Sequence, residues 1–189
     1  MKATSPQNEP LDIAQALTKG MCPVCAVLLH FQNSMAERML PNGTDHLCNH
    51  HAWLAAKMAP AENAAATFRR MLQSRAAEAK AEGECDMCRQ VRHEEELQLR
   101  ELATLLNRQT VLAWMSQQGS ICFRHAAQLK DKLPIRLQAV LAGILARTLE
   151  DLDQELSAFH ERVQRGDRSG YGVLGRAAEI LVSQRGVLR

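Results

Sequence analysis

The sequence predicts an all-α protein in which two degenerate helical repeats, each with a CxxC…CxxH metal-site motif, pack on a long helix. Apolar residues make up 46% of the 189-residue chain but aromatic residues only 4%, a composition that favours helices over sheets. No segment alternates apolar and polar residues as a half-buried strand does. The cysteines fall into two copies of one pattern, which indicates an internal duplication.

The helices follow from apolar spacing and from the positions of glycine and proline. Gly20 ends the first, and the turn signal Pro41-Asn42-Gly43 ends the second. Pro60 separates the two that follow. The helices are expected over residues 11–19, 22–40, 48–58, 61–81, 86–107, 109–117, 122–132, 135–164 and 172–184.

The helix predicted over 135–164 would be about 45 Å long at 1.5 Å per residue. It carries a coiled-coil-like seam with alternating spacings of four and three residues. It could be the spine on which both repeats pack, or it could project and form a homodimer. The seam consists of Leu145, Leu149, Leu152, Leu156, Phe159 and Val163.

The motifs divide the chain into four parts. Residues 1–20 form an N-terminal segment with a short helix, and residues 21–84 form the first repeat. The second repeat covers 85–165 and includes the long helix. A joint over 166–172 leads into the helical tail, which covers 166–189.

Each repeat contains CxxC followed by CxxH, and together they use all six cysteines. A histidine also lies five residues after each CxxC, and a proline nine residues after each CxxH, which supports a true duplication. The first copy has Cys22-Pro23-Val24-Cys25 and Cys48-Asn49-His50-His51, and the second has Cys85-Asp86-Met87-Cys88 and Cys122-Phe123-Arg124-His125.

This spacing places two metal-binding side chains on one turn at the start of a helix. The positive end of a helix lowers the pKa of a thiol and favours the thiolate that binds metal. Two such pairs facing each other supply three cysteines and one histidine, a common tetrahedral zinc shell. The predicted metal ligands are Cys22, Cys25, Cys48, His51, Cys85, Cys88, Cys122 and His125.

Two pairings of the motifs are open. We expect each copy to close its own site, because bringing together ligands that are near in sequence costs less entropy. Cys22 and Cys25 would then join Cys48 and His51, with the remaining four ligands in the other site. The alternative is a crossed arrangement, in which the CxxC of one copy faces the CxxH of the other.

Two zinc ions are the expected cofactors, and an iron–sulfur cluster is the alternative, since three cysteines and a histidine can also hold iron. Haem attachment is excluded because Ala26 and Arg89, rather than histidine, follow the two CxxC pairs. His30 and His93 are expected to support the ligands or lie at the surface. His50 could replace its neighbour as a ligand, although the repeat alignment selects His51.

Charge and targeting signals limit the partners and the compartment. The net charge of +2 gives no reason to expect a polyanionic partner. The C-terminal arginines lack the interleaved aromatic residues of proteins that bind single strands, so a nucleic-acid partner is not expected. Residues 1–10 are polar, unlike a signal peptide, and no apolar run is long enough to cross a membrane. We expect a cytoplasmic protein, in which clustered cysteines hold metal more often than they form disulfides.

With these motifs, the sequence resembles an uncharacterised bacterial family of tandem-repeat proteins. Its members pair CPxC with a later CxxH twice and end in a short helical tail. The four motifs carry the resemblance, and residues 175–181 of the tail are a fainter match. The shorter insert of the first copy departs from the pattern. The family implies the metal ligands and no particular activity.

Three functions fit these observations. The first is a metal-stabilised interaction module that binds a protein partner or a second copy through the long helix. The second is an iron–sulfur or thiol-based redox or sensor protein. The third, hydrolysis at an open zinc position, fits least well because four protein ligands leave no position for water. No catalytic motif is recognisable, so we expect binding rather than catalysis.

Overall fold

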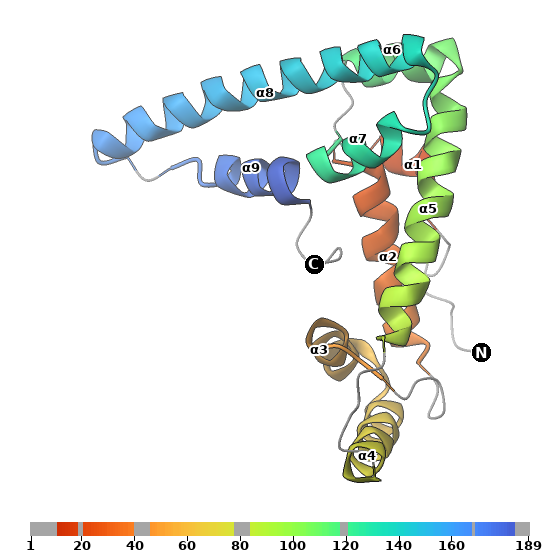
Figure 1. The fold of residues 1–189 in the computed structure, drawn as a ribbon. Coiled ribbons are helices and arrows are strands. Elements are labelled where there is room, and N and C mark those ends of the chain that lie inside the picture. The colour runs from red at the N-terminus through yellow and green to blue at the C-terminus, as the bar shows by residue number, and fades with distance from the viewer. Residues whose placement is uncertain are drawn as a thin grey trace, which may run out of the picture. The chain divides into compact units, whose positions relative to one another are not determined.

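The computed structural model describes residues 11–18, 21–39, 46–77, 84–117, 121–167 and 169–183, and every regular element among them is an α-helix. The all-α fold class is therefore confirmed. Figure 1 shows the helices, which are α1 (Ile13–Leu17), α2 (Pro23–Glu37), α3 (Asn49–Met58), α4 (Ala61–Ala77), α5 (Asp86–Leu106), α6 (Gln109–Gln117), α7 (Phe123–Lys130), α8 (Ile135–Gln164) and α9 (Gly172–Val182).

The helix bounds agree closely with the predicted ones, and α6 and α8 have the predicted first and last residues. Helices α4 and α8 each begin directly after a proline, Pro60 and Pro134. A proline at this position loses no helical hydrogen bond, because the first N–H groups of a helix have no partner within it. Gly20 and the turn predicted at 41–43 lie outside the described residues.

The chain divides into two compact units whose boundaries cut through two helices. Leu28–Glu96 belong to one unit, here called the α3–α4 unit. Asp12–Val27 and Leu97–Val187 belong to the other, the α7–α9 unit. Helices α2 and α5 each begin in one unit and continue into the other. The CxxC of each copy therefore lies in a different unit from the CxxH of the same copy.

In the α3–α4 unit, the core surrounds the start of α5 and the two helices before it. Asn63 donates from Nδ2 to the carbonyl oxygen of Met39 at 2.6 Å, which ties α4 to the segment after α2. The side chain of Phe68 on α4 packs against the same cluster. Its buried members are Ala36, Met39, Leu47, Ala55, Cys85 and Met87.

In the α7–α9 unit, α9 packs against the seam of α8, and Figure 1 shows the two helices side by side. Leu152 of α8 forms a buried cluster with Ala177 and Ile180 of α9. Phe159 meets the ring of Tyr171 edge to face, with ring centroids 5.4 Å apart. Part of the predicted seam is thus used within the chain. That both repeats pack on α8 stays a prediction.

The joint between α8 and α9 turns at two glycines, Gly166 with φ +82° and Gly170 with φ +81°. These left-handed conformations favour glycine because a side chain would clash with the backbone. Among the described helices, none combines the length and the apolar character that crossing a membrane requires.

Candidate metal centres

Each of the four cysteine motifs starts a helix, as the sequence predicted. Their first cysteines immediately precede α2, α3, α5 and α7. The carbonyl oxygen of each accepts the first helical hydrogen bond, from the residue four positions later, at 2.9–3.1 Å. The second ligand, three residues on, therefore projects from the first turn beside the first ligand. The four leading cysteines are Cys22, Cys48, Cys85 and Cys122.

The predicted ligands gather in two groups of four, and within each group the ligand atoms lie within 4.8 Å of one another. One group, here called the α2–α7 site, contains Cys22, Cys25, Cys122 and His125. The other, the α3–α5 site, contains Cys48, His51, Cys85 and Cys88.

The local pairing expected from the sequence is wrong, and the crossed arrangement is the one observed. A low entropic cost of loop closure favours local pairing only when the insert is flexible. Each insert here begins with a long helix that carries the chain away from its CxxC. Helix α2 has 15 residues, about 22 Å, and α5 has 21 residues, about 31 Å. These rigid segments separate the two motifs of one copy, and each CxxC meets the CxxH of the other copy.

In the α2–α7 site, the histidine faces the sulfurs with its Nδ1 atom. This nitrogen lies 3.3 Å from Sγ of both Cys22 and Cys25, and 3.2 Å from Sγ of Cys122. The Cys25 and Cys122 sulfurs are 3.7 Å apart. All four side chains are buried, so the site is closed to solvent.

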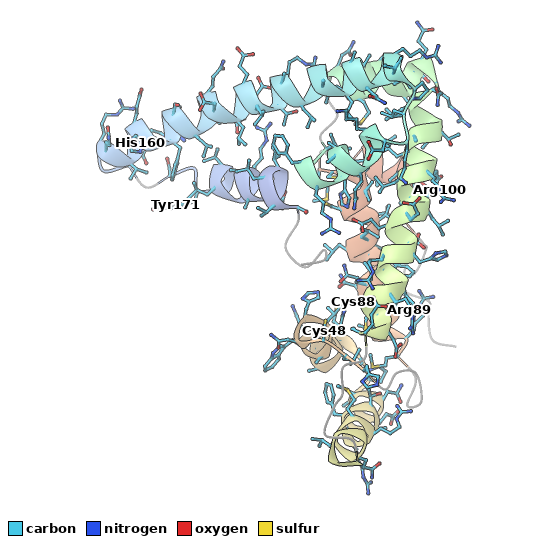
Figure 2. All side chains as sticks on the ribbon, in the orientation of Figure 1. Cys48, Cys88, Arg89, Arg100, His160 and Tyr171 are labelled. Carbon is cyan, nitrogen blue, oxygen red and sulfur yellow. The ribbon has the colours of Figure 1, made fainter. Side chains whose placement is uncertain are left out.

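The α3–α5 site repeats this geometry within the α3–α4 unit. Nδ1 of His51 lies 3.3 Å from Sγ of Cys48, Cys85 and Cys88. The Cys48 and Cys88 sulfurs are 3.6 Å apart, and Figure 2 labels this pair. These two cysteines are only partly buried. The backbone N–H of Asp86 donates to the carbonyl oxygen of His46 at 3.2 Å, and this hydrogen bond joins the two motifs.

The distances fit a single tetrahedral ion in each site. With metal–sulfur bonds of about 2.3 Å and metal–nitrogen bonds of about 2.0 Å, tetrahedral angles place two sulfurs about 3.8 Å apart and sulfur and nitrogen about 3.5 Å apart. The observed separations of 3.6–3.7 Å and 3.2–3.3 Å are close to these values. All six cysteines are free thiols. Both groups are therefore suited to bind metal.

The thiols of the α2–α7 site share hydrogen bonds that divide the charge unequally. Hydrogen bonds from the thiols of Cys22 and Cys25 lower the pKa of Cys122 strongly, against the effect of burial. The hydrogen bond to Cys122 raises the pKa of Cys25 far above its usual range. Cys122 thus ionises readily while the neighbouring Cys25 stays protonated. A bound cation would allow all three thiols of the site to ionise.

The α3–α5 site behaves in the same way. Burial raises the pKa of Cys48, but hydrogen bonds from backbone N–H groups of α3 and from the other thiols outweigh it, so the pKa is lowered. For Cys85, burial is likewise outweighed, chiefly by the hydrogen bond to His51. Burial first, and then hydrogen bonds to the other two thiols, raise the pKa of Cys88 to about 12.

Around His51 lies a polar contact that the sequence gave no reason to expect. Oε1 of Gln32, a buried residue of α2, lies 3.1 Å from Nε2 of His51 and 3.3 Å from Nε2 of His50. His50 lies beside His51 and outside the group of close donor atoms. His30 and His93 belong to neither group of ligand atoms. The repeat alignment had selected His51, and His51 is the histidine whose ring nitrogen lies within the group of ligand atoms.

Comparison with known proteins adds no relative: no protein-family model, curated protein or solved structure matches the chain. The resemblance to a bacterial tandem-repeat family stays a prediction. The two metal-binding groups define the protein at the level of its class, an all-helical protein with two Cys3His sites.

Proposed function

We propose that each site holds one zinc ion and that the ions stabilise the helical fold. The observation that carries this proposal is the closeness of the four donor atoms, all within 4.8 Å in both sites. Three thiolates and one imidazole at these separations match the shell that zinc prefers. With the crossed pairing, each compact unit contains one group of four ligands from segments far apart in the sequence, so a bound ion would join those segments.

An iron–sulfur cluster is the second candidate, and the same distances count against it. In a cluster the four ligands are divided among two or more iron atoms, so donor atoms on different irons lie further apart than those around one ion. Here each histidine nitrogen lies 3.2–3.3 Å from all three sulfurs of its site, and all four donor atoms lie within 4.8 Å of one another, which suits one shared ion better. A thiol-based redox role is the alternative for the α3–α5 site, because Cys48 and Cys88 are only partly buried and an oxidant could reach them.

Four protein ligands favour a structural role over a catalytic one. Catalytic zinc keeps a coordination position for water or substrate, and these groups supply all four positions from side chains. Zinc binding also contributes free energy to folding directly, which matters in a core so poor in aromatic residues. On this proposal, the function of the protein lies in its surfaces.

We propose further that these surfaces bind a protein, either another chain or a second copy joined through α8. The support is that Leu149 and Val163, two members of the α8 seam, remain 40% exposed beside α9. Sedimentation of the zinc-loaded protein across a concentration series tests the homodimer, which predicts a concentration-dependent mass. We place this activity in the reducing cytoplasm, where the cysteines stay available for metal.

The metal proposal is tested by anaerobic purification, elemental mass spectrometry and a visible spectrum. We expect two zinc ions per chain and no absorbance near 400 nm. Iron with acid-labile sulfide would instead establish the cluster alternative. A metal-free but folded protein would overturn both.

A further inference from the structure

From the contacts around His51, we propose that Gln32 is a positioning residue for the α3–α5 metal site. Its Oε1 accepts a hydrogen bond from Nε2–H of His51, which leaves the lone pair on Nδ1 free to bind the ion. The inference rests on the proposed zinc site. It assigns a role to a residue outside the cysteine motifs.

The direction of the hydrogen bond follows from the donor set. Nδ1 of His51 lies 3.3 Å from three sulfurs, so it is the nitrogen that faces the ion. A neutral imidazole whose Nδ1 binds metal carries its proton on Nε2. That proton points at Oε1 of Gln32, 3.1 Å away. Such a contact fixes the tautomer and the orientation of the ring.

The surroundings of Gln32 show that its orientation is set by the histidines. Its side chain is only 1% exposed. Nε2 of the amide is buried and has no hydrogen-bond partner within the part of the chain that the structure describes. If the amide were reversed, its NH2 group would face Nε2 of His51, which would then have to be unprotonated with the proton on Nδ1. That tautomer could not bind the ion through Nδ1.

His50 reinforces this arrangement from the other side. Its Nε2 lies 3.3 Å from the same oxygen, and its ring stands at 64° to that of His51 with centroids 4.9 Å apart. The side-chain oxygen of Gln32 thus lies within hydrogen-bond distance of Nε2 of both histidines. Because α2 supplies the acceptor and α3 supplies both imidazoles, the contact also joins these two helices.

The repeat provides an independent comparison. Applying the 63-residue offset between the two CxxC motifs, Glu95 takes the position of Gln32 in the second copy. In the CxxH motif, Arg124 takes the position of His50. Each copy therefore has a hydrogen-bond acceptor at the first position and a donor at the second, and the two residue types differ together between the copies, neutral Gln and His in the first and Glu and Arg in the second.

The test compares zinc affinity in three variants of the full-length protein by competition with a coloured chelator. We expect Gln32→Leu to weaken one of the two sites about 10- to 100-fold, the usual effect of losing such a partner, and to leave the other site unchanged. Exchanging both residues for those of the second copy, Gln32→Glu with His50→Arg, should restore affinity to within about threefold of wild type. Asn33→Leu, the same change at the neighbouring amide on α2, is the matched control and should leave both affinities unaltered.

A second measurement needs no variant and does not depend on how the mutants fold. In the zinc-loaded wild-type protein, 15N NMR of the imidazoles should show His51 bound to metal through Nδ1 and protonated at Nε2, with that proton slow to exchange. Metal on Nε2 of His51 would overturn the inference. Equal affinities for wild type and Gln32→Leu, or a double variant as weak as Gln32→Leu, would overturn it also. A wild-type protein that holds no zinc would instead contradict the proposed function.

Discussion

The two metal sites use the same ligands in the same local geometry, yet they differ in their exposure to solvent. In the α2–α7 site all four ligands are buried, with Cys25 and Cys122 each 1% exposed. In the α3–α5 site, the matched residues Cys88 and Cys48 are only partly buried. The two sites thus have the same donor set and differ in how the surrounding chain covers it.

If each site holds an ion as proposed, this difference predicts that the two ions stabilise the protein to different degrees. An ion in a fully buried site can leave only when the helices around it separate, whereas a partly exposed ion can be reached by solvent after a small local opening. We therefore expect the α2–α7 ion to be the more firmly held.

Removing both ions should unfold the protein. Structural zinc contributes about 10–16 kcal/mol in small zinc-binding peptides, comparable to the entire net stability of a typical domain, about 5–15 kcal/mol. Incubation with a strong chelator should abolish the far-ultraviolet circular dichroism signal of the helices, and added zinc should restore it. Retention of full helicity by the metal-free protein would show that the ions do not hold the fold together.

Removing one ligand from each site at matched positions should separate their contributions. Cys25→Ser and Cys88→Ser change the second cysteine of each CxxC, and each should reduce bound zinc from about two ions to one. We expect a loss above about 4 kcal/mol for Cys25→Ser, because it leaves a buried site without its ion, and about 2 kcal/mol for Cys88→Ser. Chemical denaturation measures both, and equal losses would contradict the contrast.

The release of metal from the wild-type protein should occur in two phases. Under excess chelator, the partly exposed α3–α5 site should lose its ion about tenfold faster, which corresponds to a difference of about 1.4 kcal/mol in the barrier to opening. Stopped-flow absorbance of the chelator follows both phases. The assignment is checked with Cys88→Ser, in which only the slow phase should remain.

The smallest effect is expected at Trp53, which lies on α3 two residues after His51 and is 73% exposed. Trp53→Ser should change stability by less than about 0.5 kcal/mol, as is usual for an exposed side chain. It should leave two ions bound. A loss of one ion in this variant would show that the indole covers the α3–α5 site and that exposure alone does not explain the contrast.

The ligands and the helices could be predicted from the sequence because their signals are local. A cysteine at the start of a helix and a second ligand three residues later share one turn whatever the rest of the chain does. The bounds of α6 and α8 followed from proline, turn signals and apolar spacing in the same way. The choice of His51 over His50 needed only the comparison of the two copies.

The tertiary structure decided which pairs of ligands meet, which histidine nitrogen faces the sulfurs and how deeply each site is buried. The pairing depends on the direction in which α2 and α5 carry the chain over about 22 Å and 31 Å, and motif spacing contains no direction. Loop-closure entropy favours ligands that are near in sequence only when the insert is flexible, and here each insert begins with a helix, α2 or α5. The contact between Gln32 and His51 could not be predicted from the sequence, because it forms only when the fold brings α3 against α2.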